Sequence, residues 1–542
     1  MSQETYDYII VGAGSAGCIL AETLSRNGRY RVILLEAGGS DNRFWIKVPL
    51  GYAFLFANPA VNWRFKAEPD AGLSDRRAYW PRGKVIGGSG SINAMFYARG
   101  LAHDFDDWEA SGAKGWHWDA VRATYDALET RAFETETGRT ETQGAGPLQV
   151  ATRPDAIHPF TRTFLQAAGQ IGWGTVPDLN APGVEGLSTV PANLHRGRRW
   201  SSADAFLGQT RRRQNLRIVR HAHAERVVFD GKRTTGVTYR VGGKTVTVHS
   251  TREVILSAGA VNSPKLLQLS GIGPAEVLKH HGVPVLHHLP QVGRGLQDHL
   301  GLSQMFQSNK DTLNAQLSPW AGQLKAGLEY VLRRSGPLSQ PINQCSGFVR
   351  SSPDQARPDM QVYCNPALYA TPEDSAPSID RVSGFSLCAQ PCRPSSRGWI
   401  EIRSANPEDA AVIQPNSLST EEDRAAAIRA GRVLQTLSQA PAIQAVTRAA
   451  VAPDITVMTD DDLLETFRQR ASTVFHPTCT CKMGQSQAHS VLDPRLRVHG
   501  MAGLRVIGAS AFPNITSGNT NAPTMMLAQR GAEMVLEDAG AA

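Results

Sequence analysis

The sequence has no long hydrophobic run, and this absence limits where the protein can reside. No segment approaches the roughly 18 uninterrupted apolar residues of a membrane-spanning helix. The first residues lead into a strand-like run without the basic segment and apolar core of a signal peptide. We therefore expect a cytoplasmic protein without a transmembrane segment, for which peripheral contact with a membrane stays open.

Cysteine and strongly one-sided charge are also scarce. Seven cysteines in 542 residues show none of the paired spacings of a zinc site, so we expect reduced thiols and no metal. The net charge of +7 accompanies no nucleic-acid-binding module, which argues against DNA or RNA as a partner. Two arginine clusters, at 196–199 and 211–213, would form either a solvated basic face or a contact with anionic lipid headgroups.

Glycine, by contrast, is abundant, and its first cluster follows a strand-like run at residues 6–11. Gly12, Gly14 and Gly17 would let the backbone turn sharply, approach a pyrophosphate and pack a helix against the strand. A second strand-like run at 31–35 leads to Glu36, whose carboxylate could accept hydrogen bonds from ribose hydroxyls. The complete unit predicts dinucleotide binding, but by itself it leaves nicotinamide and flavin cofactors open.

A second glycine-rich segment, residues 80–94, places four glycines beside small hydroxyl residues. Such a composition indicates backbone that lies against a flat or phosphorylated ligand. The irregular, aromatic stretch at 40–80 is typical of a long excursion that covers a ligand. Two phosphate-compatible segments so early in the chain suit a large, extended cofactor.

Regular elements are predicted further along the chain, which is long enough for two linked domains. Runs at 216–219, 226–229 and 234–239 predict a strand meander, and 253–260 predict a buried strand that enters a glycine turn. The next helix is expected to have Ser263 as its N-cap and Pro264 in its first position. Strands and long helices from about 301 to 469 predict a second, substrate-side domain.

Together these segments and two C-terminal runs resemble the glucose–methanol–choline oxidoreductase family, which binds FAD. The match is carried by the N-terminal glycine unit, by residues 83–93, 259–264, 270–273 and 292–299, by the run His-Pro-Thr-Cys-Thr-Cys-Lys-Met-Gly at 476–484, and by residues 518–524. These segments follow the family's order along nearly the whole chain.

The resemblance implies an α/β fold (α+β overall), with a Rossmann-type FAD-binding domain made from discontinuous segments and a substrate domain with an antiparallel sheet and helices. We expect residues 1–300 to form mainly the FAD-binding domain, with substrate-side excursions near 40–80 and 105–195. Residues 301–470 would form mainly the substrate domain, and 471–542 would return to the FAD domain with the catalytic residues.

The resemblance also implies which residues contact the FAD. They are Gly12, Gly14, Ser15, Ala16, Gly17, Glu36, Ala37, Arg82, Gly83, Val85, Gly88, Gly90, Asn93, Ala94, Met95, Ala224, Ala258, Gly259, Gly508, Ala509, Asn519, Ala522, Pro523 and Thr524.

Removing hydride from an alcohol needs a base for the hydroxyl proton and support for the charge that the flavin gains. His476 is the predicted base, because imidazole titrates near neutral pH. Asn521 matches the family's second catalytic position, and we expect it to hydrogen-bond the substrate oxygen. Pro523 suits the first position of a helix whose positive N-terminus would face the pyrimidine edge of the flavin.

Three positions depart from the family's pattern or decide between its members. Ile92 stands where some members carry a histidine bonded to the flavin, so FAD should be held noncovalently. Gly508 replaces the usual Asp, which would alter a cofactor contact. Gln344 stands where choline-oxidising relatives place Glu, which disfavours choline and favours an uncharged primary alcohol.

The sequence thus predicts an FAD-dependent dehydrogenase that oxidises a primary alcohol to an aldehyde and passes electrons to a quinone-type acceptor. The amino-acid pattern of the 476–484 run is most similar to that of bacterial alcohol, choline and sorbose dehydrogenases. The alternatives are an oxygen-using oxidase of sugar, aromatic or choline-like alcohols, a redox-silent FAD-containing lyase, and a noncatalytic flavoprotein. Retention of His476 and Asn521 argues against the last of these.

Overall fold

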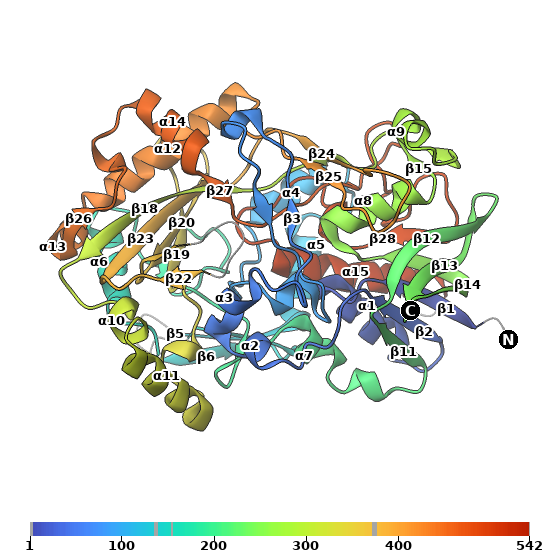
Figure 1. Ribbon diagram of the computed structural model, residues 1–542, viewed down its shortest axis with the longest axis horizontal. Helices are drawn as coiled ribbons and strands as arrows, with labels where there is room; N and C mark the ends of the chain where they lie inside the picture. The colour runs from blue at the N-terminus through green and yellow to red at the C-terminus, as the bar shows by residue number, and fades with distance from the viewer. Residues whose placement is uncertain (1–3, 135–138, 153–155, 371–376, 541–542) are drawn as a thin grey trace.

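The computed structural model describes residues 4–134, 139–152, 156–370 and 377–540. In this part of the chain, two seven-stranded sheets lie at opposite sides of the molecule, as Figure 1 shows at right and left. This arrangement confirms the predicted α/β fold class. The domain boundaries themselves stay a prediction.

The first sheet has the order β11 (Leu216–Arg220), β2 (Val32–Glu36), β1 (Thr5–Val11), β14 (Lys244–Leu256), β13 (Arg233–Val241) and β12 (His223–Asp230), and β28 (Leu504–Val506) pairs with β14. β1 runs parallel to both β2 and β14. Ile9 and Ile10 are completely buried, as expected for a parallel strand covered on both faces. Helices α1 (Ser15–Ser25) and α15 (Asn521–Asp538) pack on each other and share this core.

The predicted strand meander is partly wrong. β12, β13 and β14 do form consecutive antiparallel pairs. β11 instead lies at the other edge of the sheet, parallel to β2. The apolar pattern identifies each strand but does not distinguish a parallel partner from an antiparallel one.

Helix α8 (Gly259–Leu269) begins five residues earlier than predicted, so Ser263 is not its N-cap and Pro264 lies inside it. A proline there cannot donate to the carbonyl of Ala260, four residues before it. The Thr480 hydroxyl donates to that carbonyl instead, at 2.6 Å. A hydroxyl from the C-terminal part of the chain thus replaces the missing helical bond.

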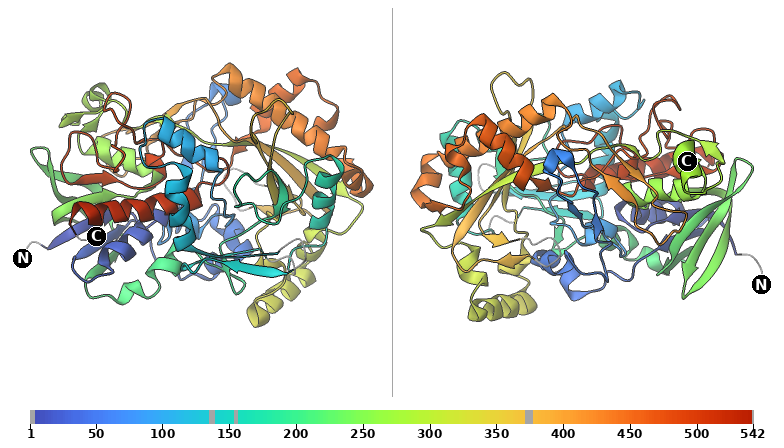
Figure 2. Two further views of the ribbon diagram at one scale, coloured as in Figure 1. Left: turned by 180° about the vertical axis from the view of Figure 1, so that it is seen from behind. Right: turned by 45° about the horizontal axis from the view of Figure 1, so that its top comes forward.

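The second sheet is antiparallel and follows the order β26 (Thr447–Ala450), β18 (Leu300–Ser308), β23 (Gly384–Pro391), β20 (Met360–Asn365), β19 (Cys345–Val349) and β8 (Gly186–Thr189), with β27 (Ser472–Thr473) beside β18. Helices α6 (Thr161–Gln170), α12 (Glu421–Ser438), α13 (Pro441–Val446) and α14 (Asp460–Arg470) share a hydrophobic core with its strands. Figure 2 shows this sheet and its helices from two further sides.

Shorter elements connect and flank the sheets. They include α2 (Phe44–Lys47), α3 (Tyr52–Leu55), α4 (Ala102–Ala110), α5 (Trp118–Leu128), α7 (Ser202–Leu207), α9 (Ala275–His280), α10 (Leu313–Leu317), α11 (Trp320–Arg333), the strands β5 (Glu129–Glu134), β6 (Thr140–Gln143) and β7 (Leu148–Ala151), and the three-stranded sheet of β17 (Arg294–Leu296), β24 (Gly398–Glu401) and β25 (Val412–Gln414). Among the described helices, none combines the length and hydropathy needed to cross a bilayer. All seven cysteines are unpaired thiols.

The hydroxyl of Thr480 gives a test of the α8 bond. Thr480→Val keeps the shape of the side chain but leaves the buried Ala260 carbonyl without a donor, which costs about 1–3 kcal/mol. We expect a lower thermal unfolding temperature for this variant than for Thr480→Ser, which keeps the hydroxyl. A Thr480→Val protein as stable as Thr480→Ser in the same melting experiment would contradict the assignment.

Candidate active site

A cavity of about 780 Å³ lies between the two sheets and is lined by both, for example by Glu36 at the end of β2 and by Tyr363 of β20. Most of the predicted site residues line it: Gly12, Gly14, Ser15, Ala16, Glu36, Ala37, Arg82, Gly83, Gly88, Asn93, Ala94, Met95, Ala224, Ala258, Gly259, His476, Gly508, Ala509, Asn519, Asn521 and Thr524. Five do not: Gly17, Val85, Gly90, Ala522 and Pro523.

Three of the residues that do not line the cavity lie in or beside the two glycine segments. A Cβ added to Gly17 would lie 1.9 Å from the carbonyl oxygen of Gly12, so this glycine allows helix and turn to touch. A Cβ on Gly90 would lie 2.9 Å from the Ser15 hydroxyl. Val85 is buried in a small hydrophobic core together with Ile46, Leu55, Val61 and Ile92. Their role is in the shape of the two glycine segments.

The two glycine segments touch at the wall of the cavity. A Cβ on Gly88 would lie 2.7 Å from the Cα of Gly14, so bare backbone is needed where they cross. Helix α1 begins beside this point, and its N-cap residue Gly14 offers no side-chain acceptor to the first-turn N–H groups. A helix N-terminus of this kind binds phosphate through its N–H groups and its positive dipole. This cradle fits the pyrophosphate of a dinucleotide.

Glu36 lines the cavity and holds two turns in place. Its carboxylate accepts hydrogen bonds from the backbone N–H groups of Ala13 and Gly38, each at 2.8 Å. Burial raises the pKa of Glu36 to about 7, against the opposing effect of these two hydrogen bonds. The carboxyl group is therefore positioned to meet hydroxyl donors of a ligand.

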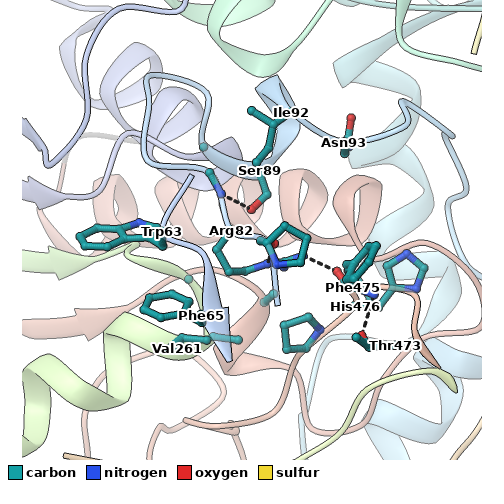
Figure 3. A pocket seen from close by; sticks show the side chains of 18 of the residues that line it. Trp63, Phe65, Arg82, Ser89, Ile92, Asn93, Val261, Thr473, Phe475 and His476 are labelled. Atoms are coloured by element: carbon teal, nitrogen blue, oxygen red, sulfur yellow. Dashed lines mark hydrogen bonds between the residues drawn. The ribbon is translucent and has the colours of Figure 1, made fainter. Parts of the chain in front are cut away.

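The second glycine segment approaches the His476 loop, as Figure 3 shows. The guanidinium of Arg82 donates to the carbonyl oxygen of Phe475 at 2.6 Å, and burial lowers the pKa of Arg82 to about 10. The backbone N–H of Gly83 donates to the Ser89 hydroxyl at 3.1 Å. Arg82 thus fixes the loop next to His476, while the aliphatic side chain of Ile92 lies along the cavity wall.

His476 is 8% exposed, and its surroundings fix both its backbone and its ring. The carboxylate of Asp298 accepts from the backbone N–H of His476 at 2.7 Å. Nδ1 of the ring lies 3.1 Å from Nδ1 of His299, and Nε2 lies 3.0 Å from Nδ2 of Asn519. Burial, reinforced by His299 and Arg82, lowers the pKa of His476 well below its ordinary value. The imidazole is therefore neutral at physiological pH.

The protons on the two histidine rings follow from their partners. Nε2 of His299 lies 2.8 Å from the carbonyl oxygen of Cys392, which can only accept, so this nitrogen carries the proton. Burial lowers the pKa of His299 to about 4, so its ring is neutral and its Nδ1 is an acceptor. The hydrogen bond between the rings then requires a proton on Nδ1 of His476. The Nε2 of His476 is left with a lone pair directed at the cavity and Asn519.

The structure brings Asn519 to His476, whereas the sequence analysis paired His476 with Asn521. The side-chain oxygen of Asn521 accepts from the Ser15 hydroxyl at 2.6 Å, so this residue joins α15 to the first glycine turn. The oxygen of Asn519 lies 3.4 Å from the amide nitrogen of Gln361, which leaves its NH₂ group to face His476. Asn519 is therefore the amide that the structure brings to His476, and the contact of Asn521 with the substrate oxygen stays a prediction.

Helix α15 presents its N-terminus to the cavity. It begins at Asn521, two residues before the predicted start, so Pro523 occupies the third helical position. A proline is tolerated there because first-turn N–H groups have no helical acceptor. Thr520 at the N-cap makes no side-chain cap hydrogen bond, and Asn521 and Thr524 line the cavity. A second positive helix end thus faces the ligand space.

Two of the three positions singled out in the sequence, Gly508 and Gln344, can be judged from the structure. Gly508 has φ +155° and ψ −170°, a backbone conformation that residues with a Cβ rarely adopt, so an Asp would be strained here. Gln344 accepts from the backbone N–H of His158 and the hydroxyl of Thr161, at 2.8 and 3.0 Å, and does not line the cavity. The argument from Gln344 against choline is therefore wrong, because its neighbour Asn343 faces the cavity instead.

Four residues near His476 were not assigned a role from the sequence. Asp298 and His299 belong to the run 292–299, which was recognised only as similar to the family. Gln361 and Tyr363 lie on β20, and their hydroxyl-to-amide hydrogen bond of 2.8 Å orders the group around Asn519. Nothing in the local pattern of that strand distinguishes them from core residues.

Comparison with known proteins gives a consistent result. The family models described as GMC oxidoreductase match residues 6–301 and 394–528. The chain is 40% identical to "Alcohol dehydrogenase [acceptor]" of Pseudomonas putida, covering 98% of this chain and 96% of that protein. It is 39% identical to "Oxygen-dependent choline dehydrogenase" of Vibrio vulnificus, covering 98% and 95%. The crystal structure of pyridoxine 4-oxidase from Mesorbium loti superposes with a TM-score of 0.86 and 28% identity, covering 97% and 98%.

The tautomer of His476 can be measured directly. NMR of the protein with isotope-labelled histidine should show His476 neutral with its proton on Nδ1. Its lowered pKa should keep it neutral on acidification through the ordinary histidine range, until the pH falls to that lowered value. His299→Leu removes the acceptor and should mix the two tautomers, whereas His299→Gln can still accept and should preserve the Nδ1–H form. A His476 that titrates near pH ~6.5 would contradict this arrangement.

Proposed function

This chain belongs to the GMC oxidoreductase family and binds FAD, and on that premise we propose that it is a dehydrogenase that oxidises an uncharged primary alcohol to an aldehyde. The observation that carries the proposal is the lone pair on Nε2 of His476, which faces the cavity 3.0 Å from the Asn519 amide. A proton acceptor beside a hydrogen-bond donor is what an alcohol oxygen needs as it loses its proton.

In the proposed reaction, His476 takes the hydroxyl proton at Nε2. The NH₂ group of Asn519 donates to the same substrate oxygen and stabilises the negative charge that develops on it. Bound FAD supplies the acceptor for the hydride, at flavin N5. The N-terminus of α15 has no side-chain cap, so its positive dipole would stabilise the negative charge that the flavin gains. The lowered pKa of His476 keeps the base unprotonated before each turnover.

The cavity wall supports an uncharged substrate. The second sheet contributes Tyr363, Asn365, Ser386 and Cys388, which are polar but uncharged. Among the described lining residues, the one carboxylate is Glu36, which is held by the backbone N–H groups of Ala13 and Gly38. A quaternary ammonium group next to His476 would therefore have no carboxylate partner from these residues.

We further propose that FAD is held noncovalently, because the aliphatic Ile92 occupies the wall where a linking histidine would stand. For the electron acceptor we propose a quinone. The relatives differ here, since the name of the Pseudomonas putida protein specifies an acceptor and that of the Vibrio vulnificus protein specifies oxygen. Oxygen is therefore the alternative acceptor to test.

The two asparagines and the histidine give separable effects. His476→Ala should retain FAD and slow anaerobic flavin reduction by at least ~100-fold, the lower range for a general base. Asn519→Ala should slow it by at least ~10-fold, somewhat less than loss of an oxyanion donor in hydrolases. Asn521→Ala removes the bond to Ser15 and should mainly weaken FAD retention, seen as flavin lost on gel filtration. Near-normal reduction by His476→Ala, or a larger rate loss for Asn521→Ala than for Asn519→Ala, would contradict these roles.

A matched pair of alcohols tests the substrate class, because 3,3-dimethylbutan-1-ol has the shape of choline without its charge. We expect the neutral alcohol to bleach the flavin faster than choline in anaerobic stopped-flow measurements. With a quinone analogue or dye, turnover should exceed oxygen consumption under the same conditions. A preference for choline would overturn the uncharged-substrate proposal, hydrogen peroxide at full turnover would indicate an oxidase, and an unbleached flavin during product formation would indicate a lyase.

A further inference from the structure

Helix α11 exposes an apolar stripe to solvent. Trp320, Leu324, Leu328 and Leu332 are spaced by four residues, so they share one face of the helix, and each is more than half exposed. The opposite face, with Ala326 and Tyr330, is buried against the protein. A surface helix normally presents its polar side to water. The orientation of α11 is therefore the reverse of what solvation alone would favour.

Further exposed aromatic residues lie on the segment next to α11. The ring of Phe44, in α2, lies 6.4 Å from that of Tyr330 in α11. Trp45 stacks on Phe54 of α3 with ring centroids 4.1 Å apart, and Phe44, Trp45 and Phe54 are all exposed. Figure 1 shows α11, α2 and α3 along the same lower edge. We call Phe44, Trp45, Phe54, Trp320, Leu324, Leu328, Val331 and Leu332 together the apolar face.

Basic side chains surround the apolar face. The loop at 195–199 reaches the end of α11, where a Cβ on Gly197 would lie 2.1 Å from the carbonyl oxygen of Arg334. In the described segments 43–56, 195–199 and 320–334, every exposed charged residue is basic: Arg43, Arg196, Arg198, Lys325, Arg333 and Arg334. The acidic residue of α11, Glu329, is only partly exposed and accepts from the Ser335 hydroxyl at 3.0 Å.

The arginine clusters recognised in the sequence divide into two kinds. Arg199 is buried and donates to the carbonyl oxygens of Ile46 and Asn93, and Arg211 pairs with Asp41 at 2.9 Å. These arginines hold the fold together. Arg196 and Arg198 are exposed beside α11 and are available to an external anion.

We propose that the apolar face docks on the surface of a bilayer that contains anionic lipids. Leu, Trp and Phe side chains on one face of a helix, with Lys and Arg at its margins, are the composition of helices that lie in the headgroup region. Aromatic rings favour this boundary, and cations near it are attracted to anionic headgroups. The protein would lie on the membrane, since the described helices include none that could span it.

The charge distribution distinguishes a membrane from a second copy of the chain. A two-fold symmetric contact places one patch against the same patch of its partner. The six basic residues around the apolar face would then meet each other, which is unfavourable. A negatively charged bilayer satisfies the same residues, so charge complementarity selects the lipid surface.

The test uses the FAD-loaded full chain and phosphatidylcholine vesicles with or without phosphatidylglycerol. We expect sedimentation with the anionic vesicles, weaker binding to the neutral ones and weaker binding at high salt. Combined Leu324→Ser, Leu328→Ser and Leu332→Ser should lower the partition coefficient by at least ~10-fold, because each leucine contributes buried apolar groups. Combined Lys325→Glu and Arg333→Glu should remove the preference for phosphatidylglycerol.

Val457→Ser is the matched control, because Val457 is 82% exposed but lies beside α12 and should not affect vesicle binding. Unchanged flavin absorbance and dye reduction in all variants would show that the fold and the active site are intact. Vesicle binding that is unaffected by the leucine substitutions would overturn the proposal. So would the absence of binding together with a concentration-dependent dimer that these substitutions dissociate, since a second copy would then be the occupant.

Discussion

The meeting of the first glycine turn with the start of helix α15 is the contact on which the site depends. The Ser15 hydroxyl donates to Asn521 at 2.6 Å, although the two residues are 506 positions apart. Because α1 packs along α15, the N-termini of both helices face one cavity, and their N–H groups and dipoles converge on a negatively charged ligand. The residues between Ser15 and Asn521 form the rest of both sheets, and the chain comes back to the first sheet before α15 begins. β28, which follows the strands of the second sheet along the chain, pairs with β14 and so belongs to the first sheet.

Burial determines the chemistry of His476. In a site that excludes water, a polar group left without a partner costs about 1–3 kcal/mol, so each nitrogen of the two histidine rings is held by one partner. A series of two hydrogen bonds runs from the carbonyl oxygen of Cys392 to His299 and from His299 to His476. Cys392 lies directly after β23 of the second sheet, and the series leaves Nε2 of His476 facing the cavity. A backbone carbonyl of one sheet thus sets which nitrogen faces the cavity. The same sheet orients Asn519 through Gln361 of β20. The proton position of the base therefore depends on contacts from the second sheet and the residue that follows β23.

The sequence predicted what local chemistry determines and was less successful where distant segments decide. The strand, glycine turn, helix and acid at residues 5–36 form a local unit, and the fold class and the FAD cofactor followed from it and from the family resemblance. The start of α8 was misplaced because Pro264 usually marks a first turn, and the Thr480 hydroxyl that permits it inside the helix lies over 200 residues away. Asn519 and Asn521 are two residues apart in a run with similar side chains. Only the backbone course into α15 decides which of them reaches His476 and which reaches Ser15.

A small hydrophobic core lies between helix α11 and the cavity, which gives the proposed membrane contact a consequence for substrate access. The small core under α10 and α11 contains Leu313, Leu317 and Ala326, and Tyr52 and Tyr369 pack against it. Both tyrosines also line the cavity. If α11 lies among lipid headgroups, this side of the cavity lies at the bilayer surface, where lipophilic alcohols and quinones are concentrated. The exposed apolar side chains, which are unfavourable in water, would then be buried in the boundary region of the bilayer. A neutral base and a substrate-side wall of uncharged residues, behind a helix that lies on lipid, suit substrates that partition out of water.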